Sequence, residues 1–178
     1  MNELQILDQL LPGVILLNCP YHSDTRGSLT KIFHDVGLNS QGIRFIPKES
    51  FFTKSAAHVL RGMHFQVGHA AHDKLVYCLK GRVLDVVVDI RKDSPYFNKP
   101  VSIELNESKS QALLICKGYA HGFLALQDES WMLYNTSTVH HPECDCGVLW
   151  SSIDFDWPIK KPILSARDLM HPSIIDRT

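Results

Sequence analysis

Residues 59–66 combine apolar side chains with one arginine and one histidine, and this run is the first place where the sequence suggests chemistry. Strand alternation puts Gly62, His64 and Gln66 on one face and Arg61 on the other. A histidine on an inward strand face titrates near neutral pH, so His64 is a candidate general base. The run by itself favours a hydrogen-bonded core histidine over a catalytic one.

Three further polar residues lie in or beside strand-like segments, namely Lys74, His121 and Tyr134. A cavity lined by strands can gather such side chains from distant positions. A neutral histidine, a lysine and a tyrosine suit proton abstraction next to a carbonyl: the first removes a carbon-bound proton, the second stabilises the enolate oxygen, and the third delivers a proton. The alternative is that Lys74 is a solvated strand end and Tyr134 a core residue.

The elements that would position these side chains are mostly short strands. Strands are predicted at residues 74–79, 83–90, 101–105, 112–116, 123–126, 131–136 and 148–150. Residues 74–90 read as a β-hairpin turning at Gly81, and residues 91–100 as a loop. Helical patterns are confined to the first dozen residues and to 164–170. Many short strands with frequent turns predict an all-β sandwich or small barrel formed by one domain, residues 1–178.

Composition narrows the possible partners and compartment. The chain has 178 residues, 44% of them hydrophobic and 21% charged, with a formal net charge of −1. This balance argues against a nucleic-acid surface and against a polybasic membrane patch. No basic, apolar leader is evident at the N-terminus, and no apolar run is long enough to span a bilayer. Five scattered cysteines do not suggest a disulfide framework, so we expect a cytoplasmic protein.

Ordered motifs along the chain carry a resemblance to a known family. They are Asp24-Thr25-Arg26-Gly27, Leu60-Arg61-Gly62-Met63-His64-Phe65-Gln66, Lys74-Leu75-Val76, the run from Gly81 to Arg91, Ser94-Pro95, Gly118-Tyr119-Ala120-His121-Gly122-Phe123, Tyr134, Pro142-Glu143, Gly147, Trp150 and Trp157-Pro158. In this order they resemble the dTDP-4-dehydrorhamnose 3,5-epimerase family, whose members are cupin-fold sugar-nucleotide enzymes. The resemblance spans residues 24–168.

The resemblance implies a cupin-type jelly roll with short peripheral helices and a catalytic set within it. His64 would be the base, with Asp168 orienting its imidazole. Lys74 would lie near the C4 keto oxygen of the sugar. Tyr134 would protonate from the opposite ring face and so invert a stereocentre.

The resemblance also implies how the substrate, a nucleotide-diphosphate 4-keto sugar, is held. Arg26 and Arg61 would bind the pyrophosphate through forked donors, and His121 would line the sugar pocket. Arg167, beside Asp168, is assigned to the same binding set. Because alternation turns Arg61 away from His64, we expect a twist or bulge at Gly62. A homodimer and a reaction without any cofactor are expected.

Several positions depart from the family pattern. The departures are Leu29, Lys31, Glu49, Phe51, Thr53, Tyr77, His140 and Asp145. Lys31, Glu49, Phe51, His140 and Asp145 are predicted to contact substrate. The segment around Glu49 and Phe51 looks more like a branch acting on GDP-linked 4-keto-6-deoxy-heptoses for bacterial capsule or lipopolysaccharide. The main hypothesis is therefore an epimerase inverting C3, or C3 and C5, of such a sugar.

Three other functions are compatible with the sequence. They are dTDP-4-dehydrorhamnose 3,5-epimerase itself, a nucleotide-sugar 3,4-ketoisomerase, and a sugar-nucleotide-binding cupin without turnover. Binding alone does not require an acid and a base on opposite ring faces, so the set of His64, Lys74 and Tyr134 favours an enzyme.

Metal binding is not expected from the sequence. The second histidine of the His-x-His pair found in metal-holding cupins is Gln66 here, and His69 and His72 fall in a small-residue loop. The run from His140 to Cys146 also looks like a ligand cluster, but it lacks the distant second ligand pair typical of zinc sites.

Overall fold

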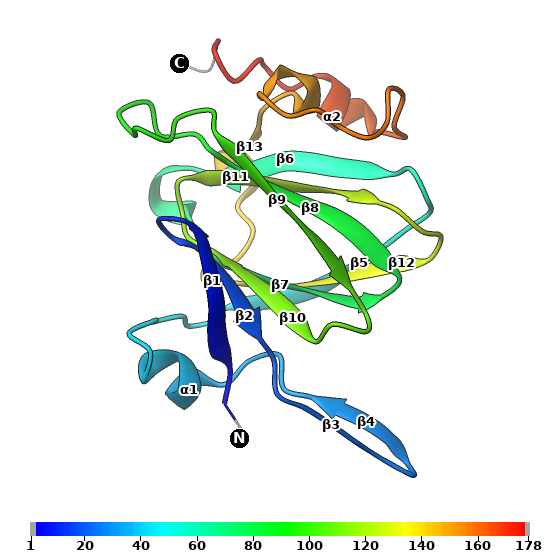
Figure 1. Cartoon of the computed structure of the whole chain (residues 1–178). Helices are drawn as coiled ribbons and strands as arrows, with labels where there is room; N and C mark the ends of the chain where they lie inside the picture. Colours follow the sequence, from blue (N-terminus) through cyan, green and yellow to red (C-terminus); the bar gives the residue numbers. More distant parts are fainter. Residues whose placement is uncertain (1–2, 177–178) are drawn as a thin grey trace.

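A computed structural model describes residues 3–176 as a sandwich of two antiparallel sheets with a small hairpin beside it (Figure 1). The first sheet has the order β1-β2-β10-β7-β12-β5, and the second has the order β13-β6-β11-β8-β9. The first is built from β1 (Gln5–Leu11), β2 (Val14–Asn18), β10 (Gln111–Ile115), β7 (Lys74–Lys80), β12 (Ser130–Thr136) and β5 (Glu49–Ser55). The second is built from β13 (Asp145–Gly147), β6 (Leu60–Gln66), β11 (Tyr119–Ala125), β8 (Arg82–Asp89) and β9 (Pro100–Asn106). The predicted all-β sandwich is confirmed.

Helices are short and lie outside the sheets. They are α1 (Asp35–Asn39), α2 (Ala166–Leu169) and the 3₁₀ turns η1 (Gly68–Ala70), η2 (Pro142–Cys144) and η3 (Trp150–Ser152). The C-terminal segment that carries α2 covers the outer face of the second sheet (Figure 1). Within the described residues, no helix is long and apolar enough to cross a membrane.

Two apolar layers hold this arrangement together. The inner layer, between the sheets, contains Val76, Val87, Leu113 and Phe123. The outer layer packs Val86 and other side chains of the second sheet against the C-terminal segment. Because both faces of β6, β8 and β11 are covered, these strands are apolar on both sides. The polar side chains embedded in them are therefore the exceptions that need an explanation.

Three local predictions are wrong. β7 and β8 do not pair as a hairpin: β7 pairs with β10 and β12, and β8 pairs with β9 and β11. Gly81, at a φ of 77°, instead passes the chain from one sheet to the other. The first residues form β1 rather than a helix, because the turn at Pro12 and Gly13 folds β1 back on β2. The strand predicted at 148–150 is not formed: the nearest strand, β13, ends at Gly147, and Trp150 begins η3.

A separate hairpin extends away from the sandwich (Figure 1). Its strands β3 (Tyr21–Asp24) and β4 (Gly27–Thr30) pair only with each other. All four residues of β3 are exposed. The hairpin therefore has little contact with the rest of the described chain.

Candidate active site

A cavity of about 700 Å³ opens between the two sheets and the C-terminal segment. It is lined by side chains from β5, β6, β7, β11, β12 and α2. Its lining includes the polar and aromatic side chains of Glu49, Phe51, Arg61, His64, Gln66, Lys74, His121, Tyr134, His140, Asp145, Arg167 and Asp168. The fold thus gathers into one cavity eleven of the thirteen residues predicted to form the site.

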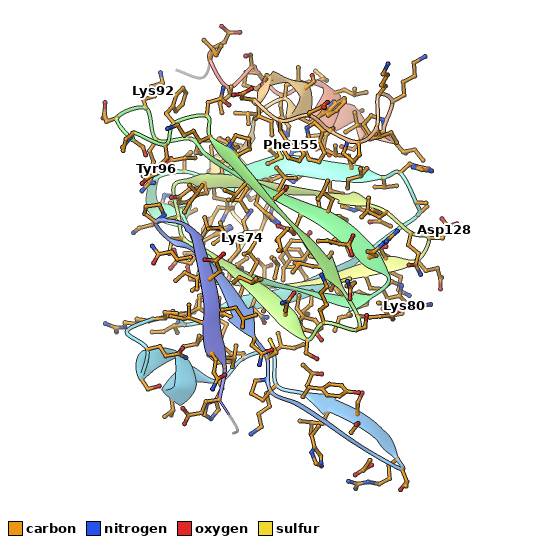
Figure 2. All side chains as sticks on the ribbon, in the orientation of Figure 1. Lys74, Lys80, Lys92, Tyr96, Asp128 and Phe155 are labelled. Carbon is orange, nitrogen blue, oxygen red and sulfur yellow. The ribbon has the colours of Figure 1, made fainter. Side chains whose placement is uncertain are left out.

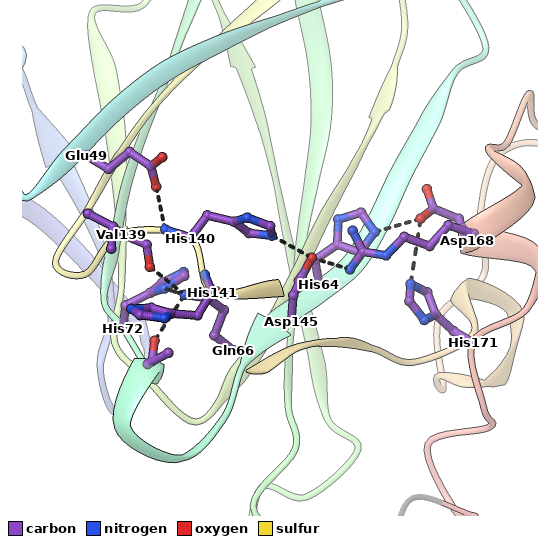
Figure 3. Close-up of polar contacts among 12 residues, drawn as sticks. Glu49, His64, Gln66, His72, Val139, His140, His141, Asp145, Asp168 and His171 are labelled. Atoms are coloured by element: carbon purple, nitrogen blue, oxygen red, sulfur yellow. Dashed lines mark hydrogen bonds and ion pairs between the residues drawn. The ribbon is translucent and has the colours of Figure 1, made fainter. Parts of the chain in front are cut away.

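His64 and Asp168 lie together at one wall of this cavity (Figure 3). Nε2 of His64 is 2.7 Å from Oδ1 of Asp168. The carboxylate is almost fully buried, whereas 28% of the His64 side chain remains exposed. Burial raises the pKa of Asp168, but hydrogen bonds with His64 and other donors outweigh it, and the pKa is lowered overall. The pair can hold one imidazole nitrogen while the other faces a ligand.

Local sequence explains why Asp168 is so well placed. Ser165 caps α2, and its Oγ accepts a hydrogen bond from the backbone nitrogen of Asp168 at 3.1 Å. A serine three residues ahead of a carboxylate is a helix-start signal that fixes the first turn. The cap therefore orients the carboxylate toward β6 although 104 residues separate it from His64.

Lys74 begins β7 and points into the space between the sheets, whereas Lys80 and Lys92 lie at the periphery (Figure 2). Its Nζ donates to the backbone oxygen of His64 at 3.0 Å. Burial lowers the pKa of Lys74 to about 8, although Asp145 and Asp85 act in the opposite direction. The group is thus a partly desolvated cation beside the imidazole wall.

Tyr134 lies on β12, opposite Phe51 in the register of β5. The two rings stack, with centroids 4.8 Å apart and planes 9° from parallel. Such a contact contributes roughly 0.5–1.5 kcal/mol beyond simple burial. Burial also raises the pKa of Tyr134 well above its usual range, so its phenol stays protonated at neutral pH. The stack holds a proton donor in a fixed orientation.

His121 faces His64 directly across the β6–β11 pair. Its Nε2 lies 2.9 Å from Oδ2 of Asp85 on β8, and both side chains are buried. Asp85 was not among the residues predicted to form the site. It lies on the face of β8 that is turned away from Val86. That face is the sandwich interior, where Val83 and Val87 flank it.

Gly62 and Gly122 have no side chains, so the backbones of β6 and β11 approach each other closely here. A Cβ on Gly62 would lie 2.6 Å from Cα of Gly122, and Gly62 has a φ of 146°. The register of the pair shifts between His121 and Phe123. Arg61 and His64 consequently line the same cavity, so the predicted irregularity at Gly62 is confirmed.

Arg61 is fixed to β5 on its side of the cavity. Its Nε donates to Oγ of Ser55 at 3.0 Å, and its Nη2 donates to the backbone oxygen of Lys54 at 3.0 Å. The guanidinium group is therefore oriented by the protein before any ligand arrives.

A chain of polar contacts crosses the cavity mouth (Figure 3). Oε2 of Glu49 accepts from the backbone nitrogen of His140 at 2.9 Å, and Nε2 of His140 lies 3.0 Å from Oδ2 of Asp145. Nη2 of Arg167 lies 2.7 Å from the same Asp145 oxygen. Burial raises the pKa of Asp145, but hydrogen bonds from His140 and Arg167 lower it overall. Glu49, His140, Asp145 and Arg167 are thus linked by direct contacts.

Arg26 and Lys31 do not line the cavity of their own chain. Arg26 lies at the turn of the β3–β4 hairpin, with 87% of its side chain exposed, and pairs with Asp24 at 2.5 Å. Lys31 follows β4 directly. Because the hairpin extends away from both sheets, one chain cannot bring either side chain to the site in this arrangement (Figure 1).

His171 was missed by sequence reasoning. Its Nε2 lies 3.7 Å from Oδ1 of Asp168, and its ring lies edge-on to His64 with centroids 5.5 Å apart. The available signal was its spacing of three residues from Asp168, just beyond the end of α2. Burial lowers the pKa of His171. A neutral His171 ring does not compete with His64 for the negative charge of Asp168.

Residues 8–176 match the family model of dTDP-4-dehydrorhamnose 3,5-epimerase. A protein of that name from Shigella flexneri is 35% identical over 176 residues, covering 97% of each chain.

Two solved structures with bound sugar nucleotides are similar along nearly the whole chain. One is a dTDP-6-deoxy-D-glucose-3,5-epimerase from Legionella pneumophila in complex with dTDP-4-keto-L-rhamnose, with a TM-score of 0.92, 28% identity, and 98% and 94% coverage of the two chains. The other is a 3'-monoepimerase from Streptomyces bikiniensis in complex with dTDP-quinovose, with a TM-score of 0.86, 27% identity, and 98% and 88% coverage.

Proposed function

Because the chain belongs to the dTDP-4-dehydrorhamnose 3,5-epimerase family, a family of isomerases, we propose that it inverts C3 and C5 of a dTDP-linked 4-keto-6-deoxyhexose. The GDP-linked heptose substrate inferred from the altered residues is not supported. The matching family and the Shigella flexneri relative are named for a dTDP sugar, and the two neighbours above hold dTDP-linked ligands. The capsule assignment that accompanied the heptose has no support either.

One observation carries the proposed chemistry: base and acid come from opposite sheets. His64 lies on β6 of the second sheet, and Tyr134 lies on β12 of the first. Both line the same cavity. A sugar ring lying between the sheets would present one face to each, and inversion requires proton removal from one face and delivery to the other.

In this mechanism His64 removes the proton from the carbon next to the ketone. Asp168 holds the imidazolium that forms, through the 2.7 Å contact. Lys74 supports the negative charge that develops on the keto oxygen. Tyr134 returns a proton to the opposite face. General acid–base catalysis of this kind contributes about 10²–10⁴-fold.

The polar side chains at the mouth supply groups for the nucleotide part. Arg61 is the cation of the cavity wall suited to a pyrophosphate oxygen. Glu49, Phe51, His140, Asp145 and Arg167 remain proposed substrate contacts. The altered identity of Phe51 and His140 is accounted for by their own partners, Tyr134 and Asp145, so it does not identify the nucleotide base.

The proposed homodimer would give the projecting hairpin a role. Arg26 was assigned to the pyrophosphate, yet it lies outside the cavity of its own chain. A second copy would bring its hairpin, and with it Arg26, to the cavity of the first chain.

We also propose a cytoplasmic location and a single-domain organisation.

Proton exchange in heavy water tests this function. The protein is given a dTDP-linked and, separately, a GDP-linked 4-keto-6-deoxy sugar, and NMR follows deuterium and ring configuration. We expect deuterium at C3 and C5 of the dTDP sugar, with inversion at both. Deuterium at C3 alone would indicate a 3-epimerase, and a migrated carbonyl a ketoisomerase. Absence of exchange with both sugars would overturn the proposal. His64→Asn should slow exchange at least about 10²-fold. His34→Asn serves as a matched control, because His34 caps α1 outside the cavity lining and asparagine also suits that position.

A further inference from the structure

A cluster of metal-ligating side chains lies outside the cavity, where η1 meets η2. Ligand atoms of His69, His141 and Glu143 lie within 4.8 Å of one another. Nδ1 of His141 is 3.3 Å from Oε1 of Glu143, and the rings of His69 and His141 are 5.0 Å apart between centroids. None of the three lines the cavity between the sheets. We propose that these residues form a Zn²⁺ site.

The donor types and their spacing suit this ion. Zinc takes imidazole nitrogen and carboxylate oxygen at about 2.0–2.2 Å in tetrahedral geometry, so two ligand atoms on one ion lie roughly 3.3 Å apart. The contact between His141 and Glu143 already has that length. The remaining pairs need rotation of exposed or half-exposed side chains. Three protein ligands leave a fourth position for water or for a further protein donor.

A thiol lies beside the cluster from the buried side. Sγ of Cys144 is 3.8 Å from Nδ1 of His69, and Cys144 is 7% exposed. A thiolate and an imidazole on one tetrahedral zinc lie roughly 3.6 Å apart, given Zn–S and Zn–N lengths of about 2.3 and 2.1 Å. Cys144 is therefore within reach of the fourth position.

The backbone already brings the two ligand-bearing segments together. The backbone nitrogen of Val67 donates to the oxygen of Cys144 at 3.0 Å, and that of Cys144 donates to the oxygen of His141 at 3.0 Å. The sequence argument against zinc was the lack of a distant second ligand pair for the run from His140 to Cys146. The fold supplies one distant ligand, His69, rather than a pair.

The ion would lie behind one wall of the cavity. The backbone nitrogen of His141 donates to Oε1 of Gln66 at 2.6 Å, and Gln66 lines the cavity (Figure 3). His140, the next residue, also lines it. A cation joining η1 to η2 would therefore fix the segment that presents His140 to a ligand.

Calorimetric titration of the metal-stripped full chain with Zn²⁺ tests the site. We expect one ion per chain with a dissociation constant in the micromolar range, about −8 kcal/mol. His141→Ala and Glu143→Gln should each weaken binding at least about tenfold. Glu143 is exposed, so its variant should fold normally.

Two control variants make the titration decisive. His22→Ala removes an exposed histidine elsewhere and should bind as the parent does. His64→Asn tests the other ligand cluster, formed by His64, Asp168 and His171. Loss of zinc binding in that variant would show that the ion binds in the cavity instead, and would overturn the proposal. Unchanged binding in both His141→Ala and Glu143→Gln, or no binding by the parent, would also overturn it.

Co²⁺ provides a spectroscopic readout of the same site. A tetrahedral Co²⁺ ion gives intense visible absorption, whereas hydrated Co²⁺ is nearly colourless. We expect intense bands in the parent and in His22→Ala and their loss in His141→Ala. Bands that persist in His141→Ala would contradict the assignment.

Discussion

Nζ of Lys74 donates a hydrogen bond to the backbone oxygen of His64 at 3.0 Å. Lys74 belongs to the first sheet and His64 to the second, so this bond joins the sheets at the cavity. An ammonium group has three donors, and this contact uses one. Two remain for a ligand, held at a fixed place relative to the proposed base.

The charge of Lys74 predicts how activity falls in alkaline solution. Burial lowers its pKa to about 8, and enolate stabilisation requires the protonated form. We expect kcat/KM to decline as the pH rises above about 8. Lys74→Arg keeps its charge and should move the decline to higher pH with lower activity, whereas Lys80→Arg should change nothing. A decline at the same pH in Lys74→Arg would assign it to another group.

The same shift affects stability in a defined direction. The folded-state pKa lies below the ordinary value of 10.5, so the native state loses its proton first as the pH rises. The cost of burying the charge is complete below about 8 and is relieved between about 8 and 10.5. In denaturant titrations, the free energy of unfolding of the parent should therefore rise relative to that of Lys74→Met as the pH rises across this window. A constant difference from pH 7 to 11 would contradict the shift.

Asp168 is predicted to act through His64. Asp168→Asn removes the charge that stabilises an imidazolium but keeps the side-chain shape. We expect kcat to fall about 10²–10⁴-fold with little change in KM. Asp154→Asn, an exposed change on the same C-terminal segment, is the control. A larger effect on KM than on kcat would assign Asp168 to binding.

Tyr134 is predicted to control the outcome of the reaction more than its start. Tyr134→Phe removes the hydroxyl and retains the ring that stacks on Phe51. Deuterium should still enter at C3, because His64 is intact, while inverted product should fall at least about 10²-fold. NMR of the product measures both. Full epimerisation by this variant would remove Tyr134 from the acid role.

Arg26 tests whether two chains build one site. Arg26→Ala should raise KM if the hairpin of a second copy reaches the pyrophosphate. Mixing the Arg26→Ala and His64→Asn proteins and allowing subunits to exchange should then restore part of the activity, since a mixed dimer contains one intact site. Arg82→Ala is an exposed control. A monomer by analytical ultracentrifugation, or unchanged kinetics in Arg26→Ala, would reject the arrangement.

The sequence was most informative about residues whose motif and strand face agree. Turns and alternation located β6 to β12 but not β1 to β5 or β13. The resemblance indicated that His64, Lys74 and Tyr134 would meet. The pairing of the strands could not be predicted in the same way. Gly81 looks like a hairpin turn, yet it passes the chain from one sheet to the other. The reason is that the neighbour of each strand depends on the packing of the whole sandwich. Asp85 was missed as a site residue because β8 is buried on both faces, so alternation does not show which of the two faces is the sandwich interior.

Contacts between residues far apart in the sequence could not be predicted either. His69 and Glu143 meet only because η1 and η2 pack together, and no local pattern specifies that. The hairpin that carries Arg26 was not among the predicted strands, and the direction in which it leaves the sandwich follows from tertiary structure.

The backbone contact between Gly62 and Gly122 has an evolutionary consequence. A side chain on either glycine would meet the backbone of the other strand at under 3.0 Å. Neither position can compensate for a change in the other, since both already carry the smallest residue. The chain therefore has no stepwise mutational route away from this pair that keeps β6 and β11 in contact. Descendants of this gene can change at other positions around the cavity, while this crossing of two strands stays as it is.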